Sequence, residues 1–225
     1  MIAAVFDLDG TLFDGRVWKG IWEHHRKFHV NLPQLYFYVG FHTLPYPLFK
    51  VGLLSRETFY LWWGKHLGWT VAGMDHQALK KMSQWLTESY IAPRIRPEIM
   101  EKLNWHKAAG HVTILLSGSY NTLAKTVARR FGFDGSIGTW LERRGNKYTG
   151  KAEPPICQGK GKVKCLELYL MSQGWDVDFG SSYAYGDSET DRFLLEKFGH
   201  PVAVYPTPEL KEIALRKGWT VIPAS

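Results

Sequence analysis

Two carboxylates stand two positions apart in the segment Asp7-Leu8-Asp9-Gly10-Thr11-Leu12, directly after a short apolar run. A carboxylate can attack phosphorus and form an acyl-phosphate, while a second acid beside it protonates the leaving oxygen and later deprotonates water. The glycine lets the backbone turn sharply after the run. The pattern therefore predicts a nucleophile and an acid/base at this point; the alternative is a plain Asp-Gly turn after a buried strand.

Ser117-Gly118-Ser119 and Lys162 are the candidates for holding a phosphate group. The serine segment follows the apolar run 112–116, so a hydroxyl and backbone N–H groups could bind a phosphate oxygen where the next helix starts. Lys162 lies in a glycine-containing loop before a predicted helix, where its point charge would oppose developing negative charge. The alternatives are that Ser119 merely caps a helix and that Lys160 and Lys162 are both solvated.

The segment Gly186-Asp187-Ser188-Glu189-Thr190-Asp191 places acids after a short apolar run and in the helical turn that follows. Mg²⁺ prefers a few carboxylates together with waters and phosphate oxygens, and Asp7 and Asp187 could supply the carboxylates. Helix capping by the acids is the alternative. It is our expectation for Glu189, which we predict to be a solvated capping residue.

Elements that position these residues can be predicted from periodicity and from turn-forming residues. An apolar start predicts a first strand over residues 1–6, and residues 15–93 predict helices broken near Pro33, near Pro45 and Pro47, and at 68–73. Beyond residue 93 the pattern predicts helices at 97–110, 121–131, 163–172, 189–198 and 208–217, strands at 112–116, 183–185, 202–205 and 220–222, and a hairpin over 138–149 that turns at 144–146.

Alternating strands and helices predict an α/β fold with a doubly wound, mostly parallel sheet and a helical cap inserted after the first strand. Ligands of such sheets bind beyond the carboxyl ends of the strands. Asp7, Ser117 and Asp187 each follow a predicted strand directly, so we expect these three residues to meet at that edge.

Composition limits the class of protein. The chain has 225 residues, of which 45% are hydrophobic and 22% charged, so it can bury a core and is not disordered, collagen-like or a coiled coil. Its two cysteines, Cys157 and Cys165, are too few for a disulfide framework and lack the spacing of a zinc site. The apolar start lacks a basic leader and no uninterrupted run reaches about 20 apolar residues, so we expect a cytoplasmic protein.

Residues 15–66 differ in composition from the rest of the chain. They include thirteen aromatic residues and seven basic ones against two acidic ones, Glu23 and Glu57, in a chain of net charge +7. The basic residues are Arg16, Lys19, Arg26, Lys27, Lys50, Arg56 and Lys65. This mixture suits an anionic substrate with an apolar portion, or peripheral contact with an anionic membrane surface, although helix packing is the plainer use of the aromatics. No nucleic-acid-binding module is recognised, so we expect no nucleic-acid partner.

In their order along the chain, the four motifs resemble those of the haloacid dehalogenase superfamily, over nearly the whole sequence. The resemblance implies a core domain formed by residues 1–14 and 94–225 and a helical cap formed by residues 15–93. This arrangement is similar to that of the phosphoserine-phosphatase-like branch of the superfamily.

The resemblance also implies a role for each motif residue. Asp7 would be the nucleophile, Asp9 the general acid/base, and Mg²⁺ the cofactor. The metal would be held by the carboxylates of Asp7 and Asp187 and by the backbone carbonyl of Asp9. The residues that would hold the phosphoryl group are Ser117, Gly118 and Lys162, and Asp191 would support Lys162 and the waters on the metal.

Arg16 departs from the phosphoserine phosphatases, which carry a glutamate nine residues after the nucleophile to pair with the substrate ammonium. Residues 137–139 and 148–151 resemble relatives with unassigned or phospholipid-type substrates. We therefore expect a Mg²⁺-dependent phosphomonoesterase that acts through an aspartyl-phosphate on a lipid-like or small organic phosphate, with Arg16 setting cap specificity. The alternatives are phosphoserine phosphatase and a non-catalytic phosphate-binding protein of the same fold.

Overall fold

A six-stranded sheet forms the centre of the computed structural model, which describes residues 1–50, 53 and 56–223. All neighbouring strands pair in parallel, in the order β3-β2-β1-β6-β7-β8. The strands are β1 (Ala3–Asp7), β2 (Val112–Tyr120), β3 (Gly135–Thr139), β6 (Tyr183–Gly186), β7 (His200–Val204) and β8 (Thr220–Ile222). The prediction of a doubly wound parallel sheet is confirmed.

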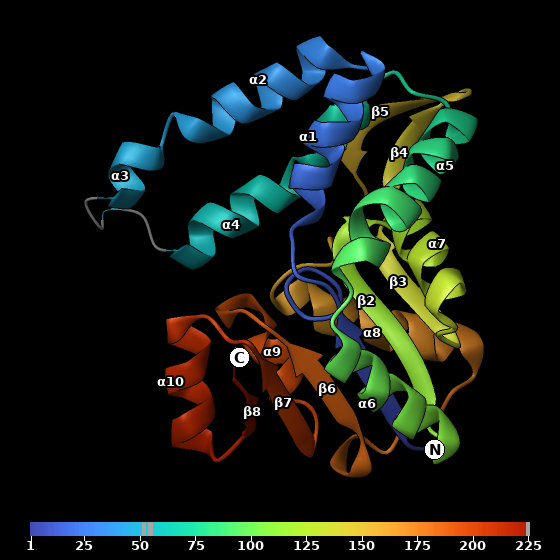
Figure 1. Cartoon of the computed structure of the whole chain (residues 1–225), viewed down its shortest axis with the longest axis vertical. Coiled ribbons are helices and arrows are strands. Elements are labelled where there is room, and N and C mark those ends of the chain that lie inside the picture. The colour runs from blue at the N-terminus through green and yellow to red at the C-terminus, as the bar shows by residue number, and fades with distance from the viewer. Residues whose placement is uncertain (51–52, 54–55, 224–225) are drawn as a thin grey trace.

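Helices cover both faces of this sheet, as Figure 1 shows. Side chains alternate along a strand, so Phe6 packs with α6 (Pro97–Ala108) and α7 (Asn121–Phe131) on one face. Val5 points to the opposite face. That face is covered by α8 (Lys160–Gln173), α9 (Arg192–Leu195) and α10 (Pro208–Lys217). Both faces of the strands are therefore buried, as parallel sheets require.

The segment between β1 and α6 is helical, as predicted. Its α-helices are α1 (Val17–Phe28), α2 (Leu32–Thr43), α3 (Tyr46–Lys50), α4 (Arg56–Lys65) and α5 (His76–Trp85), followed by a π-helical segment (Leu86–Ile91). Helices α2, α3 and α4 project to one side of the molecule as an arm, on the left of Figure 1. The side chains of Arg56 and Glu57, counted above in the charge of this segment, lie outside the described part.

The predicted hairpin exists, but its bounds were wrong. It consists of β4 (Leu141–Arg144) and β5 (Lys147–Ala152), and residues 135–139 form the parallel strand β3 instead. Gly138 was predicted as the first residue of the hairpin, yet it lies in β3, where a Cβ atom would stand 2.6 Å from the Cα atom of Asn121. Glycine is required at this position by close packing, not by a turn.

The hairpin packs against the cap segment. The backbone N–H of Gly73 donates to the carbonyl of Tyr148 at 2.8 Å, and the N–H of Tyr148 donates to the carbonyl of Met74 at 2.9 Å. A further bridge joins Asp75 to Lys147. A stretch that lies between the core strands β3 and β6 in sequence is thus joined to the cap by its backbone.

Other predicted bounds also differ from the structure, and the strand predicted over residues 112–116 continues to Tyr120. Residues 189–198 were predicted as one helix, but a 3₁₀ turn at Glu189–Asp191 precedes the short helix α9. Helix α8 begins three residues earlier than predicted, so Lys162 lies in its first turn and not in a preceding loop. Among the described residues, the helices are too short or too polar to cross a membrane.

Candidate active site

The carboxyl ends of β1 and β6 lie level with each other, and β2 runs past them on the other side of β1. Asp7, the last residue of β1, pairs with Leu116 of β2, and its neighbour Phe6 pairs with Tyr185 of β6. Ser117 is the next residue of β2, and Asp187 directly follows Gly186, the last residue of β6, so both lie beside Asp7. The register of the sheet brings the first, second and fourth sequence motifs together, as predicted.

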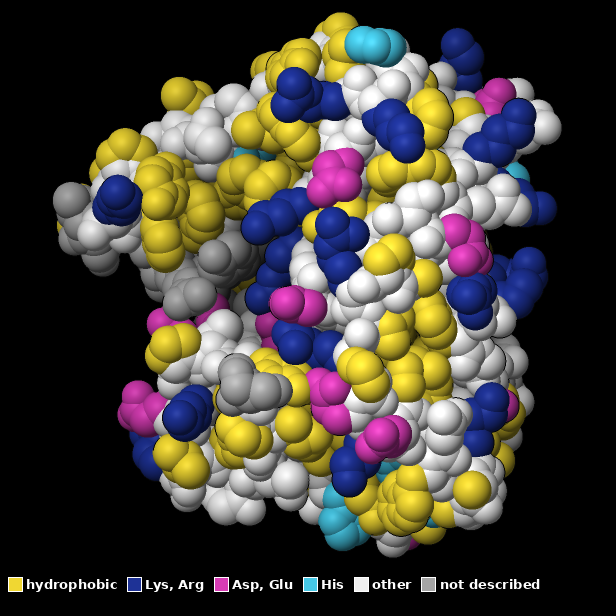
Figure 2. All heavy atoms as spheres, viewed as in Figure 1, with side chains coloured by type: hydrophobic (Ala, Val, Ile, Leu, Met, Phe, Trp, Pro, Cys, Tyr) yellow, Lys and Arg dark blue, Asp and Glu magenta, His cyan; other side chains and the backbone are white. Residues whose placement is uncertain are grey.

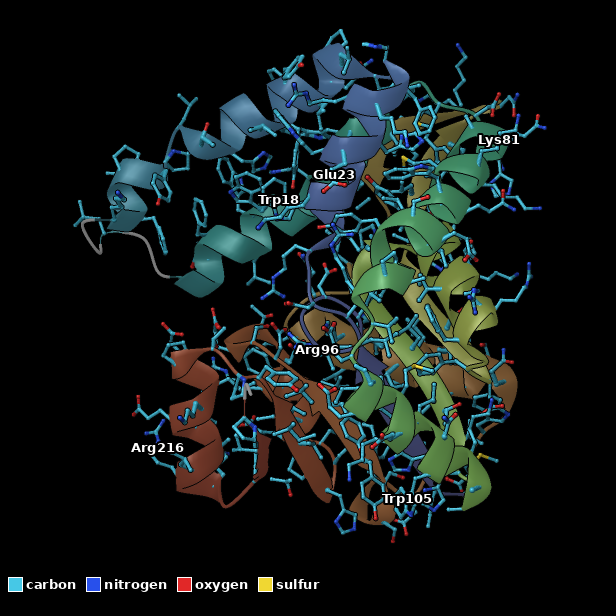
Figure 3. All side chains as sticks on the ribbon, in the orientation of Figure 1. Trp18, Glu23, Lys81, Arg96, Trp105 and Arg216 are labelled. Carbon is cyan, nitrogen blue, oxygen red and sulfur yellow. The ribbon has the colours of Figure 1, made fainter. Side chains whose placement is uncertain are left out.

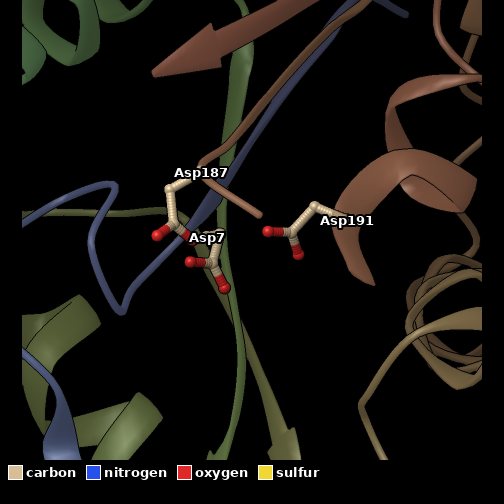
Figure 4. A group of neighbouring side chains, drawn as sticks. All are labelled: Asp7, Asp187 and Asp191. Atoms are coloured by element: carbon tan, nitrogen blue, oxygen red, sulfur yellow. The ribbon is translucent and has the colours of Figure 1, made fainter. Parts of the chain in front are cut away.

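Three buried carboxylates face one another at this edge. Asp7, Asp187 and Asp191 each offer an oxygen within 4.8 Å of the other two, as Figure 4 shows. Their exposed fractions are 4%, 4% and 1%. Such a group of acids, removed from water, needs cations close by.

Lys162 is the first of these cations. Its Nζ atom donates to Asp7 Oδ1 and to Asp191 Oδ1, at 2.5 Å in each case, and the side chain is buried. The other carboxylate oxygen of Asp191 accepts from the backbone N–H of Ser188 at 3.1 Å and from its hydroxyl at 2.9 Å. Asp191 therefore fixes the position of the lysine, and the alternative of a solvated side chain is excluded for Lys162.

Arg16 is the second cation. Its Nη2 atom donates to Asp187 Oδ2 at 2.7 Å, and its Nη1 atom donates to the backbone carbonyl of Asp9 at 2.6 Å. The carboxylate of Asp9 accepts from the backbone N–H of Val17 at 2.9 Å, where helix α1 begins. The Arg16 side chain, which we expected to set specificity in the cap, thus contacts Asp187 and Asp9 of the core.

Gly10 makes this arrangement possible. Its φ angle is +82°, a conformation that favours glycine. A Cβ atom on this residue would lie 2.2 Å from Asp187 Oδ2 and 2.8 Å from Arg16 Nη1. The backbone therefore approaches both charged groups as closely as a residue without a side chain allows.

Burial shifts the ionisation of the acids. It raises the pKa of Asp7 to about 8 against the opposing charge of Lys162, and that of Asp187 to about 6 against Arg16. Burial also raises the pKa of Asp9. For Asp191 burial acts in the same direction, but Lys162 and the hydrogen bonds from Ser188 outweigh it and hold the pKa below its usual value.

This donor set fits Mg²⁺. The carboxylates of Asp7 and Asp187 and the carbonyl of Asp9 are hard oxygen ligands, the type that Mg²⁺ prefers. Two cationic side chains contact the carboxylates of Asp7, Asp187 and Asp191, so the cluster retains excess negative potential when all three are ionised. A divalent cation would remove that excess and lower the raised pKa values of Asp7 and Asp187.

Ser117 and Gly118 lie within β2 and not after it as predicted, because the strand continues to Tyr120, and they differ in access to the cavity. The hydroxyl of Ser117 is buried and accepts from the backbone N–H of Ser119 at 3.1 Å. Gly118 and Ser119 border the cavity, and Ser119 Oγ has no hydrogen-bond partner within the described residues. The structure thus places Ser119 at the cavity wall, and the alternative that it caps the next helix is excluded, because Tyr120 is the residue that precedes α7.

A cavity of about 540 Å³ opens above the acids, between the core and the arm. Figure 2 shows this hollow, with Lys and Arg side chains gathered at its inner edge. Its floor is formed by the acids and Lys162, and its cap wall by aromatic and cationic residues. The lining residues of the cap include Arg16, Trp18, Lys19, Tyr38, Tyr46, Phe59 and Trp63.

Trp18 and Trp63 form the part of this wall nearest to α1. Trp18 projects from α1 toward α4, as Figure 3 shows, and its ring centroid lies 5.3 Å from that of Trp63. The indole N–H of Trp63 is buried and has no acceptor among the described residues. The composition of residues 15–66 predicted no position at the site for either tryptophan.

Glu189 corrects one prediction. It is 6% exposed, not solvated, and it lines the cavity. Its Oε2 atom accepts from the hydroxyl of Thr207 at 3.0 Å, while Oε1 has no partner in the described part of the chain. Thr207 was missed, although a polar residue shortly after strand β7 is the type of signal that had identified Asp7 and Asp187.

The sequence is similar to that of known phosphatases. The family model described as haloacid dehalogenase-like hydrolase matches residues 4–196. A histidinol-phosphatase of Neisseria meningitidis is 31% identical over 154 residues, which are 68% of this chain and 69% of that protein. The phosphoserine phosphatase SerB1 of Mycobacterium tuberculosis is 28% identical over 67% of this chain and 48% of its own length.

Solved structures share the fold. A protein of unknown function from Bordetella pertussis superimposes with a TM-score of 0.80 at 26% identity, over 98% of this chain and 97% of that one. A substrate-bound phosphoserine phosphatase superimposes with a TM-score of 0.65 at 19% identity, over 99% and 93% of the two chains. The second likeness extends to the fold alone.

Proposed function

The chain belongs to the haloacid dehalogenase-like hydrolase family as a phosphatase, and from this premise we propose that it hydrolyses a small phosphomonoester through an aspartyl-phosphate on Asp7, with Mg²⁺ as cofactor. The observation that carries the proposal is the contact of Lys162 with both Asp7 and Asp191 on the floor of the cavity. A buried ammonium group held beside a carboxylate is suited to stabilising a phosphoryl group that the carboxylate attacks.

In the first step, a carboxylate oxygen of Asp7 attacks phosphorus, and the bond from phosphorus to the ester oxygen breaks. The carboxylic acid of Asp9 gives its proton to the leaving oxygen, which departs as an alcohol. Burial raises the pKa of Asp9 and so favours the protonated form that this step requires.

In the second step, water attacks the phosphorus of the acyl-phosphate and Asp9 accepts its proton. Phosphate leaves, and Asp7 is again a carboxylate. Lys162 and the backbone at Gly118 and Ser119 hold the phosphoryl oxygens through both steps. Mg²⁺, held by Asp7, Asp187 and the carbonyl of Asp9, would supply charge neutralisation at those oxygens.

The cavity also favours a type of substrate. Aromatic side chains form its cap wall, and Arg16 and Lys19 add positive charge, so an anion with a compact apolar or aromatic portion fits better than a zwitterion. Glutamate is absent at position 16, where phosphoserine phosphatases pair with the substrate ammonium. We therefore propose an apolar phosphomonoester, with lipid-like esters included, in preference to phosphoserine.

Peripheral contact of the arm with an anionic membrane belongs to the same proposal, for a protein that we expect in the cytoplasm. The arm exposes large apolar side chains, among them Phe37 at 61% and Leu44 at 74%, and Figure 2 shows apolar atoms gathered over it. Sedimentation with anionic vesicles, with neutral vesicles as the control, tests this point. Equal recovery of the protein with anionic and with neutral vesicles would contradict contact with an anionic membrane.

Hydrolysis of p-nitrophenyl phosphate with and without Mg²⁺ tests the reaction class. Radiolabelled substrate quenched in acid should leave label on the chain, and hydroxylamine should release it, as expected for an acyl-phosphate. Mg²⁺-dependent turnover without such label would remove the aspartyl-phosphate from the proposal.

A further inference from the structure

Arg16 occupies the place among the acids where a cation is needed. Its two terminal nitrogens bridge Asp187 Oδ2, at 2.7 Å, and the carbonyl oxygen of Asp9, at 2.6 Å. Both oxygens belong to the donor set that fits Mg²⁺. The guanidinium group thus fills, with its own charge, the position at which these two oxygens converge.

We infer that Arg16 is an internal counter-cation of the site, which Mg²⁺ displaces from Asp187 into the substrate cavity. This inference rests on the metal dependence proposed above and adds to it a residue that responds to the metal. In the absence of the ion, Arg16 neutralises the buried carboxylate of Asp187. In its presence, the same guanidinium leaves Asp187 and points into the cavity that Arg16 already lines.

Simultaneous occupation is opposed by geometry and by charge. Mg²⁺ binds oxygen ligands at about 2.1 Å in a near-octahedral shell, which leaves no room for a guanidinium on the same two oxygens. A charge of +1 at hydrogen-bond distance from those oxygens would also repel the ion in a site this poorly screened. The ion and Arg16 therefore compete for one position.

The backbone allows the side chain to move while the site stays in place. Arg16 precedes helix α1 in an extended conformation, with φ of −134° and ψ of 128°, and the next N–H, of Val17, is held by Asp9 Oδ1. The Arg16 side chain is 41% exposed, whereas that of Asp187 is 5% exposed, and Arg16 lines the cavity together with Lys19. Rotation of the Arg16 side chain alone therefore frees the carboxylate of Asp187 to bind the metal.

Titration calorimetry with Mg²⁺ in the absence of substrate tests this inference on Arg16→Gln. Lys19→Gln is the matched control, because it removes one positive charge from the same cavity wall without touching Asp187. We expect Arg16→Gln to bind Mg²⁺ at least about fivefold more tightly than the wild type, and Lys19→Gln to change the affinity less than about twofold. Equal effects of the two variants would show a general charge effect and overturn the inference, as would an unchanged or weaker affinity in Arg16→Gln.

The wild-type protein offers a second readout that needs no variant. In crystals soaked with Mn²⁺, we expect the bond from Arg16 to Asp187 to be broken and the guanidinium to point into the cavity. An ion bound to Asp187 with that bond intact would overturn this inference and leave the proposed function standing. Failure of wild-type protein to bind any divalent ion would overturn both.

Discussion

Lys162 donates from Nζ to Asp7 Oδ1 at 2.5 Å, although 155 positions separate the two residues. The bond joins the first turn of α8 to the last residue of β1, and Asp191 holds the same ammonium group from the other side. This contact orients the proposed nucleophile before substrate arrives. It also makes the lysine the cation nearest to the attacking group.

Replacement of Lys162 by Ala should lower kcat by at least about a hundredfold, because the developing phosphoryl charge loses its fixed cation. Lys160→Ala is the matched control, two residues away on the same helix, where the lysine lies over the ring of Phe193. Its kcat should stay within about twofold of the wild type. Steady-state assays with p-nitrophenyl phosphate measure both, and a larger loss in Lys160→Ala would shift the third motif by two residues.

Asp7→Asn should abolish turnover, since the amide cannot form an acyl-phosphate. The fold should persist, because the substitution keeps the size of the side chain and removes one charge from a crowded acidic cluster. Activity assays and circular dichroism together measure this. Residual activity above about one hundredth of the wild type would contradict the role of Asp7 as nucleophile.

Chelation by excess EDTA should remove activity, and added Mg²⁺ should restore it. Ca²⁺ should oppose the restoration, because its larger and more flexible coordination shell fits a compact site of a few carboxylates poorly. Initial rates in titrations of Mg²⁺ against a fixed Ca²⁺ concentration measure the competition. Full activity in EDTA would exclude the metal from the reaction.

Among substrates, phenyl phosphate should give a kcat/KM at least about tenfold above that of phosphoserine, because the cap wall offers aromatic contacts and no carboxylate at position 16. Trp63→Leu should reduce this preference. Trp105→Leu is its control, since Trp105 lies on the core far from the cavity, as Figure 3 shows. A higher kcat/KM for phosphoserine than for every apolar ester would contradict the proposed substrate and favour the alternative of a phosphoserine phosphatase.

His106 should make the stability depend on pH. Burial, and then the charge of His111, lower the pKa of His106 from 6.5 to about 4. The unfolded chain binds a proton near pH 6.5 and the folded chain does not, so this contribution is complete above pH 6.5 and is lost as pH falls from 6.5 toward 4. Between pH 6.5 and pH 4, the contribution of His106 to the free energy of unfolding amounts to up to about 3 kcal/mol.

Urea unfolding of the wild type and of His106→Gln at pH 7.5 and pH 4.5 measures this contribution. The difference in unfolding free energy between the two proteins should shrink as the pH falls, because the variant lacks the group that resists protonation. The comparison of the two proteins removes the effect of the acids, whose raised pKa values act in the opposite direction. A difference in unfolding free energy that is the same at both pH values would contradict a lowered pKa of His106.

Elements with clear end signals could be predicted from the sequence. Helix α7 has the predicted bounds because Gly132, with φ of +78°, ends it by a backbone bond to Ala128. Helix α8 was predicted too short because Gly161 was read as part of a loop. A Cβ atom there would lie 2.0 Å from the carbonyl oxygen of Ile156, so this glycine serves a close approach inside the helix.

The meeting of the motif residues at one edge of the sheet could also be predicted from the sequence. Asp7 ends β1, Asp187 directly follows β6 and Ser117 lies in β2 beside Asp7, so the register of one parallel sheet brings the three residues together. The cavity wall was not predictable, because Trp18 and Trp63 meet through the packing of separate cap helices. The position of Arg16 depends on the path of the loop between β1 and α1, which spacing along the chain does not determine.

The backbone bonds between the β4–β5 hairpin and residues 73–75 have a consequence for engineering. A chimera that exchanges residues 15–93 between two relatives would leave behind the strand pair to which the donor cap is joined. The graft that preserves these bonds consists of two separate pieces, residues 15–93 and residues 141–152. The two pieces are therefore adjacent in space but separate along the gene, and recombination needs a second pair of crossovers to transfer both.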